Sequence, residues 1–186
     1  MGGITVAPPW DAAPPADGTL VIVYPSTGFG TGHHQTTRLC LGLLQKVDVA
    51  GRRAVDLGTG SGVLALAAWR LGAADIEALD DDEDAIVNAR ENLRLNRAET
   101  AITLRQADVR VEPVAPGDVV MANLTGAMLI SQAPTLSALV RPGGTLIVSG
   151  FVATEVDAIN GMFTPTLAPV DEAGEDAWRA LRFIRV

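Results

Sequence analysis

A glycine-rich loop, followed by an acidic residue at the end of the next predicted strand, is the segment best suited to bind a ligand. The loop runs Asp56-Leu57-Gly58-Thr59-Gly60-Ser61-Gly62. Glycines let the backbone approach a ligand closely, and the free N–H groups of the following helix suit a carboxylate or a phosphate. Asp80 comes 22 residues after Gly58, where its carboxylate can accept both hydroxyl hydrogens of a ribose. The pattern predicts a cofactor that contains a nucleoside.

The spacing of the glycines discriminates between nucleoside cofactors. Dinucleotide enzymes use G-x-G-x-x-G, which would place a third glycine at Val63. The loop instead reads D-x-G-x-G-x-G, which favours S-adenosylmethionine. We expect Asp56 near its ammonium group, Gly58 and Gly60 around its amino-acid part, and Asp80 on its ribose. The alternatives are a nucleotide-binding module or reductase that uses NAD, and a glycine turn without a ligand.

Two polar residues that follow later strands extend this site. Asp108, after a strand over residues 102–106, is a candidate acceptor for an adenine amino group, and the alternative is a solvated loop acid. Asn123 ends a strand over residues 118–122, where its amide can orient a substrate amine. Asparagine is also a favoured N-cap, so Asn123 could begin the helix expected from Leu124, and both roles are compatible.

The elements that must position these residues alternate regularly along the chain. Apolar runs predict strands over 19–24, 54–57, 76–79, 102–106, 118–122, 145–149 and 180–186, and helices over 63–71, 83–95, 124–139 and 154–162. A further helix, with Thr36 and Thr37 as candidate N-cap residues, buries Leu39, Cys40 and Leu43. Strands separated by helices imply an α/β fold with a mainly parallel sheet covered by helices on both faces.

Composition limits the class of protein. With 186 residues, 48% of them hydrophobic, the sequence supports one compact domain over 19–186, preceded by a Pro- and Ala-rich lead-in over 1–18. There is no signal-peptide pattern and no apolar run near the roughly 20 residues of a membrane helix. The single cysteine, Cys40, excludes an internal disulfide, so we expect a cytoplasmic protein. A net charge of −8 disfavours nucleic acid and is compatible with a basic protein substrate. Nothing indicates the oligomeric state.

The sequence resembles the PrmA family, the bacterial methyltransferases of the large-subunit ribosomal protein eleven, over nearly its whole length. The most specific motif is Gly28-Phe29-Gly30-Thr31-Gly32-His33-His34-Gln35-Thr36-Thr37, followed by a leucine-rich helix and the glycine loop. The likeness continues through Leu71-Gly72-Ala73, Asn88-Ala89-Arg90-Glu91-Asn92, Ala122-Asn123-Leu124, Arg141-Pro142-Gly143-Gly144 and Ser149-Gly150.

This resemblance implies a Rossmann-like class I methyltransferase fold with seven strands. It also implies methyl transfer from S-adenosylmethionine to lysine or N-terminal amines of a protein. The family's cofactor contacts fall on Thr37, Gly58, Asp80 and Asn123, and Phe29, Thr31 and His34 would line the cofactor's methionine end or the amine entrance. Without the resemblance, Thr37 reads as a helix cap and His33 and His34 as a surface pair. No cysteine or third histidine completes a metal site around them.

For the chemistry we expect direct in-line transfer to a neutral amine that Asn123 orients, with His34 as the only nearby candidate base. The family also carries a separate N-terminal domain that recognises the ribosomal protein, and this sequence begins where the linker after it should end. Without that domain, a different protein or a small amine is the alternative acceptor. A non-catalytic cofactor-binding protein is the remaining alternative.

Overall fold

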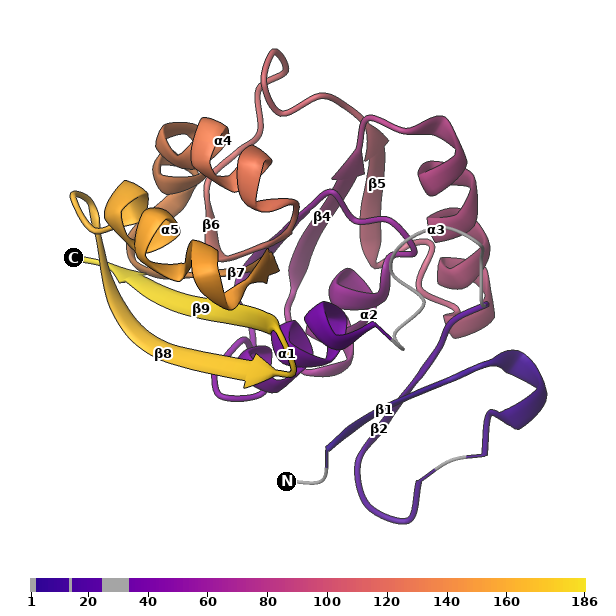
Figure 1. Ribbon diagram of the computed structural model, residues 1–186. Helices are drawn as coiled ribbons and strands as arrows, with labels where there is room; N and C mark the ends of the chain where they lie inside the picture. The colour runs from indigo at the N-terminus through magenta and orange to yellow at the C-terminus, as the bar shows by residue number, and fades with distance from the viewer. Residues whose placement is uncertain (1–2, 14, 25–33) are drawn as a thin grey trace.

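The computed structural model describes residues 3–13, 15–24 and 34–186, and a seven-stranded sheet forms its centre (Figure 1). The strand order is β5-β4-β3-β6-β7-β9-β8. Their bounds are β3 Arg53–Leu57, β4 Asp75–Asp80, β5 Ile102–Gln106, β6 Gly117–Asn123, β7 Val140–Val152, β8 Leu167–Glu175 and β9 Trp178–Arg185. The pairs from β5 to β7 are parallel, and β9 is antiparallel to both of its neighbours. This arrangement confirms the expected α/β fold.

Helices cover both faces of the sheet. On one face lie α1 (Gln35–Leu44), α2 (Val63–Arg70) and α3 (Glu83–Asn96), and on the other α4 (Gly126–Ala138) and α5 (Val156–Phe163). Leu44 and Leu66 are fully buried in the first layer, and Leu136 and Phe163 in the second. Central strands are therefore apolar on both sides, as in the fully buried run Val119–Ala122 of β6.

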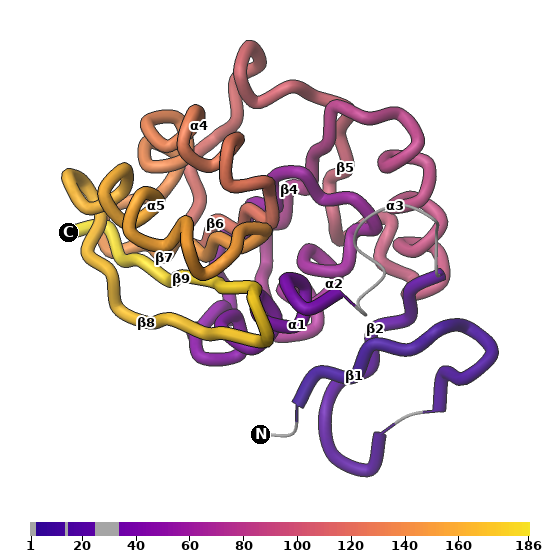
Figure 2. Tube along the Cα trace, viewed as in Figure 1, coloured from indigo at the N-terminus to yellow at the C-terminus, as the bar shows by residue number. Residues whose placement is uncertain are grey.

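The direction of the chain changes beside β3. Figure 2 shows the chain passing from β3 through β4 to the edge strand β5, then crossing back to β6, which pairs with β3 on its other side. Helices leave the carboxyl ends of β3 and β6 toward opposite faces of the sheet. A crevice forms at such a switch point, and ligands of open α/β sheets bind there.

A second, two-stranded sheet lies beside α2 and α3. Strand β2 (Thr19–Ile22) pairs in parallel with β1 (Ile4–Ala7), so the strand expected over 19–24 is not part of the main sheet. Residues 1–18, expected to be an extended lead-in, contain β1 and the short 3-10 helix η1 (Pro9–Asp11). Another 3-10 helix, η2 (Ala153–Glu155), precedes α5.

The edge strand β8 was absent from the predicted elements. Its sequence, Leu-Ala-Pro-Val-Asp-Glu-Ala-Gly-Glu, is acidic and lacks an apolar run. Only Leu167 of this strand is buried. Pairing with β9 forms it, and an edge position tolerates Pro169. Strand β7 extends beyond the predicted residues 145–149 at both of its ends.

Two predicted helix starts were wrong. The N-cap of α1 is His34, whose ring nitrogen accepts from the Thr36 backbone, so Thr36 and Thr37 lie in the first turn. The N-cap of α4 is Thr125, so the helix begins at Gly126 rather than at Leu124, and Asn123 is not its cap. In both cases the sequence offered more than one possible cap residue within a few positions, and local geometry selected one of them.

Candidate functional site

A cavity of about 760 Å³ opens at the carboxyl ends of β3, β4 and β6. This volume lies within the range of small-molecule sites. Gly58 and Gly60 form its floor, Asp80 and Asp108 line one end, and Asn123 and Trp178 lie on the lining as well. Predicted site residues from four separate segments are thus brought to one cavity.

The glycine loop is held in a left-handed conformation. Gly58 has φ +67°, and a Cβ at this position would lie 2.4 Å from the side chain of Leu124. The N–H groups of Gly58 and Thr59 both donate to the carbonyl of Leu79, at 2.9 and 3.0 Å. A larger residue at position 58 would therefore require both an unfavourable φ and a displaced Leu124.

Asp56 supports the loop from beneath. Its Oδ2 accepts from the Thr59 hydroxyl at 2.6 Å and from the Ala65 N–H at 3.1 Å, so it also caps the start of α2, where Gly62 offers no side chain. Burial raises the pKa of the carboxyl to about 6, although these two hydrogen bonds oppose the shift. Oδ1 is buried and has no partner among the described residues. Asp56 is not among the described side chains that line the cavity, and its expected contact with an ammonium group stays a prediction.

Asp80 lies at the end of β4, half-buried on the cavity wall. Its Oδ2 accepts from the Gly60 N–H at 2.9 Å, and its Oδ1 accepts from the Asp82 N–H at 3.1 Å. A carboxylate oxygen has two lone pairs, so each oxygen can still accept a further hydrogen bond. Asp80 therefore has acceptor positions left at the cavity, and its expected contacts to two ribose hydroxyls stay a prediction.

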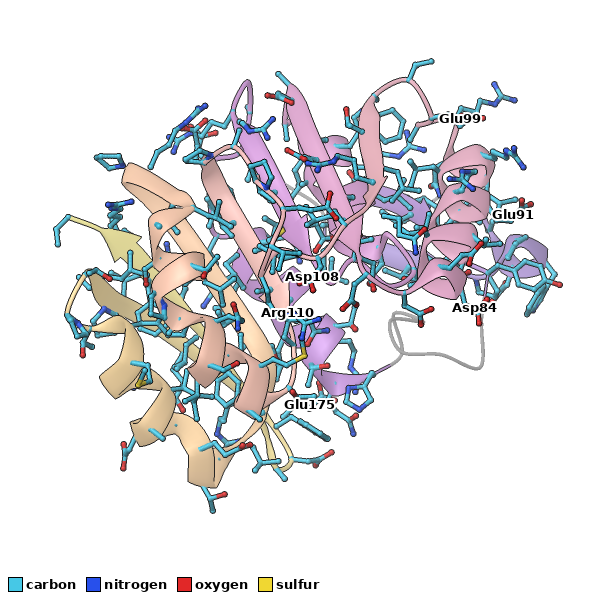
Figure 3. All side chains as sticks on the ribbon, turned by 90° about the horizontal axis from the view of Figure 1, so that it is seen from above. Asp84, Glu91, Glu99, Asp108, Arg110 and Glu175 are labelled. Carbon is cyan, nitrogen blue, oxygen red and sulfur yellow. The ribbon has the colours of Figure 1, made fainter. Side chains whose placement is uncertain are left out.

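Asp108 forms an ion pair that the sequence did not reveal. Arg110 Nε donates to both of its oxygens, at 2.7 and 2.9 Å, and holds the pKa of the Asp108 carboxyl below its usual range. Arg110 Nη2 also reaches Asp81 Oδ2 at 3.3 Å, which joins the loops after β4 and β5. Figure 3 shows Asp108 and Arg110 between α4 on one side and α3, with Asp84 at its end, on the other. All four residues line the cavity. Asp108 is thus an oriented acceptor rather than a free loop acid.

Asn123 and Thr37 meet across the cavity from different elements. The Asn123 Nδ2 at the end of β6 donates to Thr37 Oγ1 in the first turn of α1, at 3.4 Å. Thr37 is buried and Asn123 is half-buried. This bond uses the donor side of the Asn123 amide, so Oδ1 is its acceptor for an incoming N–H.

His34 lies at the same end of the cavity, packed on Trp178. The two rings meet edge to face with their centroids 4.9 Å apart. His34 Nδ1 lies 2.8 Å from the Thr36 hydroxyl and takes part in the α1 cap. The ring is consequently held by the fold at its Nδ1 side. Phe29, Thr31 and His33 lie outside the described residues. Within the part of the chain that is described, no group of His, Cys, Asp and Glu could hold a metal ion.

The described lining is acidic at the end where the nucleoside is expected. Its acids are Asp80, Asp81, Asp82, Asp84 and Asp108, and Arg110 is the one arginine or lysine in the same described lining. The other end combines Thr125, Met128 and Gln132 of α4 and its cap with Trp178 and His34. The cavity thus pairs a strongly polar end with an amphipathic one.

The strand order, the glycine loop and the cavity at the switch point define a Rossmann-like class I methyltransferase fold. A family model described as "Ribosomal protein L11 methyltransferase (PrmA)" matches residues 2–185, and the chain belongs to that family. A ribosomal protein L11 methyltransferase of Symbiobacterium thermophilum is 37% identical over 96% of this chain and 59% of its own length. One of Geobacter metallireducens is 40% identical over 97% and 60%.

Solved structures agree with this assignment. The crystal structure of a ribosomal protein L11 methylase from Lactobacillus delbrueckii subsp. bulgaricus has a TM-score of 0.89 and 26% identity, and the match covers 100% of this chain and 95% of that one. The N-methyltransferase NodS from Bradyrhizobium japonicum, in complex with S-adenosyl-L-homocysteine, shares the fold, with a TM-score of 0.64 and 16% identity over 82% and 89% of the two chains. The chain spans about 60% of the length of the curated relatives named above. In the described residues, no helix has the length and hydropathy needed to cross a membrane.

Proposed function

We propose that this chain binds S-adenosylmethionine and transfers its methyl group to an amine of a protein. The observation that carries the proposal is the convergence of Gly58, Asp80 and Asn123 on one cavity at the switch point of the sheet. These residues come from the ends of three neighbouring strands. The proposal treats residues 19–186 as the catalytic domain.

The residues present fit this cofactor. A Cβ at Gly58 would lie 2.4 Å from the side chain of Leu124, which also lines the cavity, so a glycine lets a ligand approach the loop backbone closely at this point. The buried, unpartnered Oδ1 of Asp56 lies under the same loop, where it suits an ammonium group. Asp80 suits the ribose hydroxyls, and Asp108, oriented by Arg110, suits the adenine amino group.

Once bound, S-adenosylmethionine supplies a methyl group attached to a sulfonium leaving group. The protein's task is then orientation and exclusion of water. Asn123 Oδ1 accepts an N–H of the acceptor amine and directs its lone pair into the cavity, while Thr37 holds the Asn123 amide. Met128 and Trp178 supply apolar surface for the alkyl part of an amine-bearing side chain.

The amine must be neutral, because an ammonium has no lone pair. His34 remains the candidate base, and it would have to use Nε2, since Nδ1 takes part in the helix cap. No base is required when the amine reaches the site already neutral. The contact between Asn123 and the amine therefore matters more to the proposed reaction than proton transfer to His34.

We assign the acceptor to the large-subunit ribosomal protein eleven, because the curated relatives carry that substrate in their names. The net charge of −8 suits a basic protein. Such an acceptor places the reaction in the cytoplasm. Since this chain spans about 60% of those relatives, a small amine or another protein is the second candidate acceptor.

Calorimetric titration with S-adenosylhomocysteine, with NAD as the comparison ligand, tests the cofactor. Binding of the first and not of the second is expected, and tight NAD binding alone would refute the proposal. Transfer of a radiolabelled methyl group to purified ribosomal proteins, and separately to free lysine, tests the acceptor. A protein that binds the cofactor but labels neither acceptor would refute the assignment of the ribosomal protein as the acceptor.

Asn123 gives the test of its own role. Asn123→Ala removes the acceptor for the amine, so methyl transfer should fall at least about tenfold while S-adenosylhomocysteine affinity changes less. Asn123→Asp keeps an acceptor and loses the donor to Thr37, so it should retain more activity than the alanine variant. Equal turnover of the wild type and Asn123→Ala would exclude this role.

A further inference from the structure

The glycine loop is tied to the strand β2 through one buried side chain on α3. Asn92 Nδ2 donates to the Ser61 carbonyl at 2.8 Å, and its Oδ1 accepts from the Tyr24 N–H at 2.7 Å. Asn92 is fully buried. Ser61 belongs to the cofactor loop, and Tyr24 follows β2 and directly precedes residues 25–33. One amide thus links two segments that are far apart in the sequence.

The hydrogen bond from Asn92 to Ser61 adds to the bonds that hold the glycine loop in one conformation. The peptide between Ser61 and Gly62 is held at both of its polar ends, because the Gly62 N–H donates to the Thr59 carbonyl at 2.9 Å. Gly62 also packs closely on α3, where a Cβ would lie 3.3 Å from the Leu93 side chain. With the Gly60 N–H on Asp80, each half of the loop has a fixed peptide orientation.

Only a side chain with a donor and an acceptor can make both bonds from this position. A leucine of similar volume would leave the carbonyl of the buried Ser61 and the Tyr24 N–H without these partners. The amide geometry is itself constrained, because Asn92 Nδ2 also lies 3.4 Å from Asn88 Oδ1. Asn88 lines the cavity.

We propose that Asn92 is a positioning residue for the cofactor: it fixes the Ser61 carbonyl, and with it the glycine loop, relative to the point where β2 ends. The identity of the ligand in this inference rests on the proposed function. The effect of Asn92 on the loop rests on the hydrogen bonds described above. Asn92 lies beneath the loop and sets the directions of its peptides. It is not among the described residues that line the cavity.

The chain supplies a matched control one helical turn later. Asn96 is also buried on α3 and also binds the β2 backbone, accepting from the Ile22 N–H at 3.0 Å and donating to the Ile22 carbonyl at 2.6 Å. In the described structure it makes no hydrogen bond to the glycine loop. Asn92 and Asn96 therefore share a helix, burial and a bond to the backbone of residues 22–24. They differ in that Asn92 Nδ2 donates to Ser61, whereas Asn96 Nδ2 donates to the Asn92 backbone carbonyl at 2.8 Å.

The test compares Asn92→Leu with Asn96→Leu by thermal unfolding, calorimetry with S-adenosylhomocysteine, and hydrogen exchange of the loop amides without ligand. Both variants should lower Tm. Asn92→Leu should weaken binding about tenfold or more, as expected for a lost hydrogen bond that orders the site, and Asn96→Leu by less than about threefold. Loop amides 58–62 should exchange faster only in Asn92→Leu.

Two results would overturn the inference: unchanged exchange and affinity in Asn92→Leu, or an equal loss in Asn96→Leu. If the wild type does not bind S-adenosylhomocysteine, the proposed function fails, and the exchange comparison still decides whether Asn92 fixes the loop. Should a leucine variant not fold, the pair Asn92→Ala and Asn96→Ala replaces it under the same criteria.

Discussion

Asn123 at the end of β6 donates a hydrogen bond to Thr37 in the first turn of α1, at 3.4 Å. The two residues lie far apart in the sequence, and the bond joins the element that precedes the sheet to its central strand. It holds the Asn123 side chain at the cavity wall with Nδ2 toward Thr37, and Oδ1 is left to accept from an amine. The Thr37 hydroxyl should therefore affect the rate of the proposed methyl transfer.

Replacing Thr37 by valine tests whether the hydroxyl affects methyl transfer. Valine preserves the shape and removes the hydroxyl, so the Asn123 amide loses its acceptor and is free to rotate. We expect kcat to fall about tenfold, the equivalent of one hydrogen bond, in a radiolabelled-methyl assay. Thr37→Ser should restore most of the activity. Full activity in Thr37→Val would show that the bond does not orient Asn123.

Asp80 should be essential for cofactor affinity. Asp80→Asn replaces one carboxylate oxygen by a donor, which cannot accept a ribose hydroxyl hydrogen and also faces the Gly60 or Asp82 N–H. Calorimetry should show S-adenosylhomocysteine affinity reduced about tenfold to a hundredfold, as expected for a charge-assisted pair. Asp84→Asn, an exposed acid at the same cavity, is the control and should change affinity little. Equal effects of both substitutions would indicate a general charge effect.

Arg110 should contribute to cofactor binding through Asp108. Arg110→Met removes the guanidinium that donates to both Asp108 oxygens, so the pKa of that carboxyl should return toward its ordinary range. We expect S-adenosylhomocysteine affinity to fall a few-fold at neutral pH and to weaken further toward about pH 4.5, where the carboxyl begins to take up a proton. Wild-type affinity should change less over this interval. Parallel pH profiles would contradict the prediction.

Asp56 should make the folded protein less stable as the pH rises. Burial raises its pKa in the folded protein to about 6, so between the ordinary value of 3.8 and 6 the unfolded chain releases the proton while the folded chain keeps it. Rising pH therefore reduces the free energy of unfolding from this group, by roughly 3 kcal/mol in total. Asp56→Asn removes the effect. Its stability relative to wild type, from urea unfolding, should be higher at pH 8 than at about pH 4.5, and an equal difference at both would refute the assignment.

The sequence was sufficient for the elements whose signal is local. The apolar run of β6 and the glycine loop between β3 and α2 are patterns within a few residues, and the switch-point position of Gly58 and Asp80 follows from the order of the elements. Edge strand β8 could not be predicted in the same way, because its acidic sequence becomes a strand only by pairing with β9. Arg110 was missed although Asp108 is only two residues away, because two charged residues in one loop do not show in the sequence whether their side chains meet, and its second partner Asp81 comes from another loop.

The roles of the polar residues depended most on geometry. Asp56 is the first residue of the glycine loop in the sequence, yet its side chain lies beneath the loop and caps α2. Thr36 and Thr37 had the right residue type for a cap, but His34 occupies that position. Asn92 gave no sign of a contact with Ser61, because that contact needs α3 packed on the glycine loop. Such tertiary hydrogen bonds have no signature within a short window of sequence.

The ring contact between His34 and Trp178 joins the start of the first helix of the main fold to its last strand. During synthesis the glycine loop and Asp80 emerge early, whereas the strand that carries Trp178 emerges near the end. β9 inserts between β7 and β8, so the sheet closes only when the C-terminal residues are available. The wall of the cavity that Trp178 supplies is accordingly the last part to form, and a nascent chain stopped before residue 178 would lack that wall.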